Sequence, residues 1–123
     1  MKRNKSKGFT LVEIMIVVAI IGLLAGLSIP GLQRARMRAQ GYRVVNDARQ
    51  ADAAIDQFAL ETGQINGNPV NTTLAALYLK GTWPTNDILG NPYTYTVVGP
   101  TQVQISSTTK TALSGVGINW GSF

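Results

Sequence analysis

The 123-residue sequence contains no cysteine and no histidine, and it has only six carboxylate side chains. Without cysteine the chain has neither a disulfide framework nor a thiolate metal site. Without histidine it also lacks the side chain most often used as a general base and as a zinc ligand. These absences argue against an enzyme, and they predict neither a cofactor nor a metal centre.

Positive charge is concentrated at the start of the chain. The net charge is +5, and four of the eleven basic residues lie in the first seven positions: Lys2, Arg3, Lys5 and Lys7. Only Lys80 and Lys110 are basic after residue 61. A short basic run before an apolar stretch is typical of a targeting segment or a membrane-surface contact. No nucleic-acid partner is expected.

A long apolar run follows this basic start. Between Phe9 and Ile29 the only polar side chains are Thr10, Glu13 and Ser28, and Glu13 is the only charge. At about 1.5 Å per residue, a helix over this run covers roughly 30 Å, the thickness of the hydrocarbon core of a bilayer. The run is therefore long enough to span a membrane. The short segment before it favours a cytoplasmic N-terminus.

The small residue Gly8 precedes the apolar run, whereas a secretory signal peptide has its small residues after it. The sequence Lys-Gly-Phe-Thr-Leu-Val-Glu at residues 7–13 resembles the prepilin peptidase site of type IV pilins and type II secretion pseudopilins, and the resemblance continues to Pro30. It implies cleavage between Gly8 and Phe9 and N-methylation of the new amino group of Phe9. It also implies a single-pass protein of the bacterial inner membrane, with a cytoplasmic leader and a periplasmic C-terminal head.

Glu13 has two interpretations. A carboxylate in hydrocarbon costs at least about 2.5 to 3.5 kcal/mol, whereas a position in the first turns of a helix recovers only about 0.3 to 1 kcal/mol. The first interpretation is a negative charge placed favourably at a helix N-terminus. The second, which we favour, is that Glu13 serves subunit assembly by pairing with the amino group of Phe9 on a neighbouring subunit, as the resemblance implies.

The small residues Gly22, Gly26 and Ser28 are either a face for close helix packing or ordinary constituents of a membrane span. The ring of Pro30 conflicts with the carbonyl of Gly26 in a continuous helix. We therefore predict a helix break, in the form of a kink or an unwound turn, at Gly26 and Pro30.

After Pro30 the apolar residues narrow to one stripe with helical spacing: Met37, Gly41, Val44, Ala48, Ala51, Ile55 and Phe58. Gly63 is suited to the left-handed conformation that ends a helix. The stripe predicts an amphipathic helix that ends near residue 62. Arginines dominate its beginning and carboxylates its end. This distribution of charge has three interpretations. It is an ordinary solvated face with an Arg43–Asp47 pair, or the arginines contact lipid headgroups, or the opposite charges of staggered neighbouring helices set their register.

The last sixty residues are richer in turns. We predict a loop over 64–71, a short helix from Leu74 to Lys80 capped by Thr72 or Thr73, and a hairpin of Tyr93–Val98 with Thr101–Ser107. The alternation of Val116, Ile118 and Trp120 suggests a third strand.

These elements predict an α+β, pilin-like fold in which a long N-terminal helix packs against a small antiparallel sheet. The expected divisions are a leader at 1–8, a membrane or filament-core half-helix at 9–30, an amphipathic half-helix at 31–62 and a head at 63–123. Residues 83–93 also resemble a segment of the major type II secretion pseudopilins. Ile88 replaces their usual proline, and no acidic residue follows Asp87 to supply the calcium ligands of those proteins.

The resemblance implies a structural subunit that is processed by prepilin peptidase and polymerises from an inner-membrane assembly platform into a helical homo-oligomeric filament with other minor pilins or pseudopilins. The segment at 83–93 favours a type II secretion pseudopilin, located in the periplasm when assembled. One alternative is a subunit of a surface type IV pilus, with a role in adhesion, motility or DNA uptake. An alternative of another class is a monomeric, membrane-anchored binding module.

Overall fold

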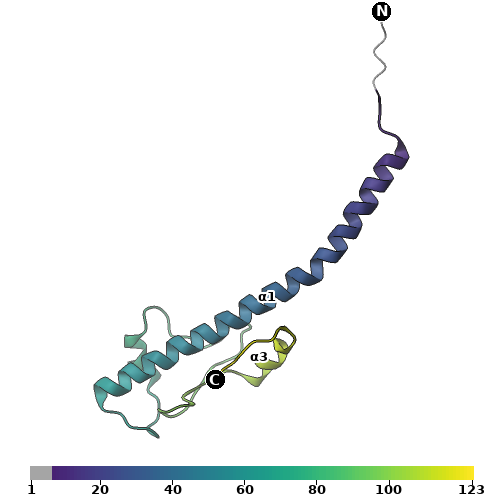
Figure 1. The fold of residues 1–123 in the computed structure, drawn as a ribbon. Helices are drawn as coiled ribbons and strands as arrows, with labels where there is room; N and C mark the ends of the chain where they lie inside the picture. Colours follow the sequence, from purple (N-terminus) through teal and green to yellow (C-terminus); the bar gives the residue numbers. More distant parts are fainter. Residues whose placement is uncertain (1–6) are drawn as a thin grey trace, which may run out of the picture. The chain divides into compact units, whose positions relative to one another are not determined.

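The computed structural model describes residues 7–123 (Figure 1). The expected leader, residues 1–8, lies mostly outside the described residues. The chain divides into two compact units, one ending at Ala35 and one from Arg36 to Phe123, and the long helix α1 contributes to both. The elements are α1 (Leu11–Thr62), α2 (Thr72–Ala75), η1 (Ala76–Tyr78), β1 (Thr94–Tyr95), β2 (Val103–Gln104), α3 (Ser107–Ala112) and η2 (Ser114–Val116).

In the first unit, α1 begins at Leu11 and runs without interruption through Gly26 and Pro30. The helix therefore has no unwound turn there, and a kink at Gly26 and Pro30 stays a prediction. Proline removes a single backbone hydrogen bond, and a helix can accommodate that loss without ending. Gly26 also has no side chain to add to the crowding around its carbonyl. A break at this position that forms only on assembly remains a prediction.

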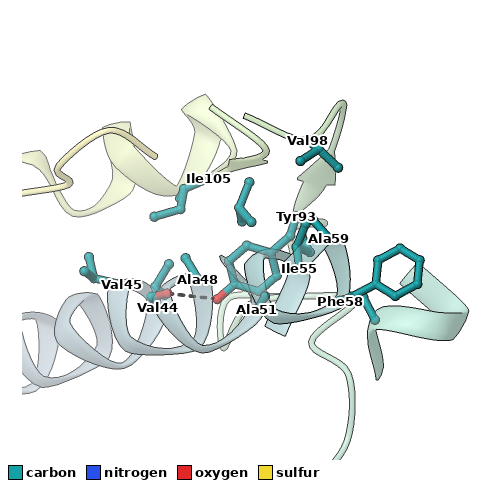
Figure 2. Packing of buried hydrophobic residues seen from close by; sticks show 12 residues of the cluster. Val44, Val45, Ala48, Ala51, Ile55, Phe58, Ala59, Tyr93, Val98 and Ile105 are labelled. Atoms are coloured by element: carbon teal, nitrogen blue, oxygen red, sulfur yellow. Dashed lines mark hydrogen bonds between the residues drawn. The ribbon is translucent and has the colours of Figure 1, made fainter. Parts of the chain in front are cut away.

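In the second unit, the predicted stripe of α1 is confirmed as the face that forms the core. Val44, Ala48, Ala51 and Ile55 are fully buried, and the helix ends at Thr62, followed by Gly63 with φ of 69°. Figure 2 shows this face of α1 beneath side chains from the rest of the head. The side chains that pack against it include Tyr93, Val98, Val103 and Ile105.

Gly41 allows the C-terminal segment to approach α1 closely. A Cβ atom at this position would lie 2.3 Å from Cδ1 of Ile118. Ile118, Trp120 and Phe123 pack against the core, although they are only partly buried. These residues form no strand, so the predicted third strand is wrong. The apolar alternation reflected contact with the helix rather than pairing with the sheet.

The predicted hairpin is confirmed in its pairing but not in its length. Thr94 pairs with Gln104 and Tyr95 with Val103, and each strand has only two residues. The chain after Tyr95 also turns to a different partner, the loop at 67–70. The Gly67 N–H donates to the Val98 carbonyl at 2.9 Å, and the Val98 N–H donates to the Asn68 carbonyl at 2.8 Å. Competition for these backbone groups shortens the hairpin.

Local capping explains two further differences from the predicted elements. The short helix begins at Thr72, and its cap is Asn71, whose side chain accepts a hydrogen bond from the Leu74 N–H at 3.1 Å. Thr72 and Thr73 are therefore not the cap. Residues 107–112, partly predicted as strand, form α3 because the Ser106 side chain caps their first turn by accepting from the Thr108 N–H at 3.2 Å.

Candidate processing and assembly site

The residues on either side of the predicted cleavage point lie outside any regular element. Gly8, Phe9 and Thr10 precede α1 and are exposed, and Phe9 retains 85% of its accessible surface. A Cβ atom added to Gly8 would meet no atom within 4 Å. A protease needs an accessible segment of chain, and these residues are accessible.

Thr10 and Glu13 cap the start of α1 reciprocally. The Glu13 N–H donates to Oγ1 of Thr10 at 3.2 Å, and the Thr10 N–H donates to Oε2 of Glu13 at 3.3 Å. This is a capping box, which satisfies two backbone donors that the first turn of a helix leaves free. Sequence reasoning placed Glu13 near the helix N-terminus but missed Thr10 as its partner. The spacing of Thr and Glu three residues apart before an apolar run was the available signal.

The apolar run of α1 has no covering among residues 7–123. The helix is long and apolar enough to cross a membrane, and none of the most apolar window is buried among the described residues. Phe9, Leu11, Leu23 and Leu27 each keep about two thirds or more of their surface exposed. A side-chain surface of this kind is not stable in water without a bilayer or other protein around it.

The small residues of this run fit either of the interpretations left open by the sequence. Cβ atoms added at Gly22 and Gly26 would meet nothing within 4 Å. The Ser28 hydroxyl donates to the Leu24 carbonyl at 2.9 Å, so its hydrogen-bonding capacity is met inside the helix. No contact with another described residue explains why these side chains are small.

The charged residues of α1 do not form the ion pair considered in the sequence. Between residues 7 and 123, no ion pair joins Arg43 to Asp47. Asp52 and Asp56 instead accept hydrogen bonds from Nε2 of the buried Gln102, at 2.9 and 2.7 Å. Burial and the nearby charge of Asp56 raise the pKa of Asp52, and the hydrogen bond from Gln102 partly opposes that rise.

The segment around Asp87 is organised by hydrogen bonds to its buried carboxylate. Oδ1 of Asp87 accepts from the N–H groups of Leu89 and Asn91, both at 2.9 Å. Oδ2 accepts from the Thr109 hydroxyl, which ties the segment to α3. Asp87 therefore has a structural role here. No group of three potential metal-ligating side chains occurs within residues 7–123.

Comparison with known proteins finds similarity in the N-terminal part of this chain. A family model described as the prokaryotic N-terminal methylation motif matches residues 3–29. A type II secretion system core protein G of Klebsiella michiganensis is 38% identical over 64 residues, which are 52% of this chain and 45% of that protein. The type IV major fimbrial protein FimA of Dichelobacter nodosus is 46% identical over 59 residues, 48% of this chain and 38% of that protein.

A fimbrial protein of Neisseria meningitidis serogroup B is 38% identical over 69 residues, 56% of this chain and 41% of that protein. In each of these three cases the alignment spans less than half of the relative's length. No solved structure matches the chain. The chain is therefore similar, over its N-terminal half, to pilins and pseudopilins, and its α+β arrangement of a long helix and a small antiparallel sheet is pilin-like.

Proposed function

We propose that this chain is a structural subunit of a type IV filament system. It is made as a precursor, cleaved by prepilin peptidase between Gly8 and Phe9, methylated on the amino group of Phe9 and held in the bacterial inner membrane by the apolar run. An assembly platform then polymerises it into a helical filament. Its role is structural rather than catalytic.

The observation that carries this proposal is the apolar run of α1, in which no residue is buried and which overlaps the N-terminal methylation motif with its exposed residues Gly8 and Phe9. An anchor alone needs only the apolar length. The methylation motif and Glu13 add features that a simple anchor does not require, and both are accounted for if the same helix leaves the bilayer to pack against other copies.

Glu13 is the residue we assign to assembly. Its carboxylate is held at the start of α1 by Thr10, and it has no cationic partner within residues 7–123. Cleavage at Gly8 creates an ammonium group on Phe9, and a neighbouring copy could present that group to Glu13. A desolvated carboxylate gains most from a charged partner, so this pairing would select correctly placed neighbours.

Within this class we favour a type II secretion pseudopilin. The similarity to core protein G supports this assignment, as does the Asp87–Tyr93 segment, whose carboxylate-centred turn is intact although Ile88 replaces the usual proline. The assembled filament would then lie in the periplasm. The similarity to fimbrial proteins supports the second candidate, a subunit of a surface type IV pilus.

Co-expression with prepilin peptidase and an assembly platform tests the proposal. Mass spectrometry should find a chain that begins at Phe9 and carries one added methyl group, and electron microscopy of overexpressing cells should find filaments that contain the chain. A chain that keeps residues 1–8 in the presence of an active peptidase would contradict the processing step. A processed chain that stays monomeric under all conditions would favour the membrane-anchored binding module.

Two Glu13 variants separate assembly from processing. Glu13→Gln keeps the side-chain size and the acceptor for the Thr10 N–H, whereas Glu13→Ala loses both. Both variants should be cleaved and inserted in the membrane, and both should lose most filament formation because each lacks the charge. Normal filaments from Glu13→Gln would show that the cap, and not the charge, is the function of Glu13.

A further inference from the structure

One carboxylate on α1 differs from its neighbours because it has no partner. Asp47 is half-buried, and no hydrogen bond or ion pair joins its side chain to another residue within 7–123. Asp52 and Asp56, further along the same helix, are both hydrogen-bonded to Gln102. A partly desolvated carboxylate without a donor is less stable than a paired one, so Asp47 is the one of these three aspartates that has most to gain from an external cation.

Asp47 lines a cleft between α1 and the loop at 82–86. Gln50 and Trp83 line the same cleft, and the Trp83 ring packs on Tyr95 with ring centroids 5.1 Å apart. Asp47 and Trp83 thus lie on the same cleft, and burial, followed by the negative charge of Asp47, raises the pKa of Tyr95. A carboxylate beside an aromatic ring suits a guanidinium group, which binds both.

Suitable guanidinium groups occur earlier on the same helix. Arg36 and Arg38 are exposed, and neither forms an ion pair with another residue in the described part of the chain. They precede Asp47 by eleven and nine positions, which corresponds to about 14 to 17 Å along a helix axis. That separation prevents a direct pair within one chain. A parallel second copy displaced by this distance would bring them to the height of Asp47.

We propose that the cleft at Asp47 receives Arg36 or Arg38 of a second copy of this chain. The inference rests on the proposed filament function and specifies a contact within the filament. Arg43 lines the same cleft and carries the same charge as the incoming arginine. Because Arg43 repels the incoming arginine, the pairing adds little affinity, and its main effect is to set the axial register between neighbouring copies.

Cross-linking in the cysteine-free chain tests this contact directly. One copy carries Arg36→Cys or Arg38→Cys, a co-expressed copy carries Asp47→Cys, and filaments are treated with a short bismaleimide. An arginine–carboxylate pair holds Cα atoms farther apart than a disulfide allows, so a spacer is needed. Asn46→Cys is the matched control, because it is exposed and adjacent but points about 100° away around the helix.

We expect cross-linked dimers with Asp47→Cys and one of the two arginine variants, at least about ten times more than with Asn46→Cys. Filaments that give no such dimers, or equal amounts with Asn46→Cys, would overturn this inference and leave the proposed function standing. Absence of any filament from the unmodified chain would instead contradict the proposed function.

Charge exchange provides a second readout that does not depend on cysteine. Asp47→Arg should reduce filament yield several-fold, because like charges then meet at the cleft. Combining it with an aspartate at the arginine position that cross-links should restore most of the yield, because the pair is re-formed with its signs exchanged. No restoration by the double variant would count against the pairing, provided that both variants are folded, membrane-inserted and processed.

Discussion

The two stretches of α1 differ in where their apolar side chains find a partner. From Leu11 to Leu32 the helix is apolar on every side and buries none of this surface, whereas from Gly41 to Ala59 it has a single apolar stripe that is buried under the head. A narrow stripe needs one neighbour, and an all-round apolar surface needs neighbours on every side. The first stretch is therefore suited to a bilayer and then to a filament core, and the second stretch to its own head.

The largest effect that separates the two stretches should come from removing one isoleucine from each. Ile55 is fully buried and Ile20 is about half exposed. Ile55→Ala should lower the free energy of unfolding of the head by about 2 to 5 kcal/mol. Ile20→Ala should leave it unchanged, because Ile20 makes no contribution to the core. Urea unfolding in detergent, followed by the fluorescence of Trp83 and Trp120, measures the unfolding free energy of both variants. Equal losses of stability would contradict the division of α1 into an uncovered stretch and a stretch that forms the core of the head.

The glycines of α1 provide a second matched pair. Gly41→Leu should destabilise the head by about 1 to 3 kcal/mol, because the new side chain would occupy the space of Ile118. Gly26→Leu has open space around it and should not change the unfolding of the head. The same urea titration applies. A Gly41→Leu variant as stable as the unmodified chain would show that Ile118 is not fixed against the helix.

Removing a side-chain cap should likewise destabilise the head only when the cap lies in the head. Asn71→Ala should cost the head about 0.5 to 2 kcal/mol, because it removes the acceptor for the Leu74 N–H. Thr10→Ala should leave the stability of the head unchanged and should fray only the first turn of α1. Hydrogen exchange resolved by residue distinguishes them. Faster exchange across the whole head in Thr10→Ala would show that the two stretches are coupled.

The smallest effect should be a change in pH dependence at Asp52. Its pKa is raised above the ordinary value of 3.8, mainly by burial, so the folded head binds its proton more tightly than the unfolded chain does. This contribution to stability is greatest at acid pH and is lost as pH rises above about 3.8. Asp52→Asn, which keeps an oxygen acceptor for Gln102, should flatten that dependence. An unchanged pH profile of urea midpoints would contradict the assignment.

The sequence predicted the parts of the fold that depend on long, regular patterns. The stripe from Gly41 to Phe58, the helix end at Gly63 and the antiparallel pairing of the two hairpin strands all follow from periodicity or from turn residues in the sequence. The failures have local causes. Asn71 and Ser106 supply caps where other residues or a strand were expected, and Val98 pairs with the loop at Gly67 and Asn68, a choice between backbone partners that no local pattern reveals.

For the candidate site, too, the sequence suggested the residues of a local motif and missed the contacts between residues that are distant in sequence. Gly8, Phe9 and Glu13 occupy a short contiguous motif, so a single sequence was sufficient to propose them, and their roles stay predictions. Gln102 reaches its partners on α1 across about fifty positions of sequence, and Thr109 meets Asp87 across about twenty. Contacts between distant residues depend on the finished fold, and single-sequence patterns carry no information about them.

The account's central claim is that other copies of this chain cover the exposed stretch of α1. Single cysteines test it, because the chain has none of its own: Val18→Cys in the exposed stretch and Thr111→Cys on the surface of the head, each labelled with a maleimide in sheared, intact filaments. We predict rapid labelling of Thr111→Cys and strong protection of Val18→Cys until the filaments are dissociated. Equal labelling of both positions in intact filaments would contradict the claim.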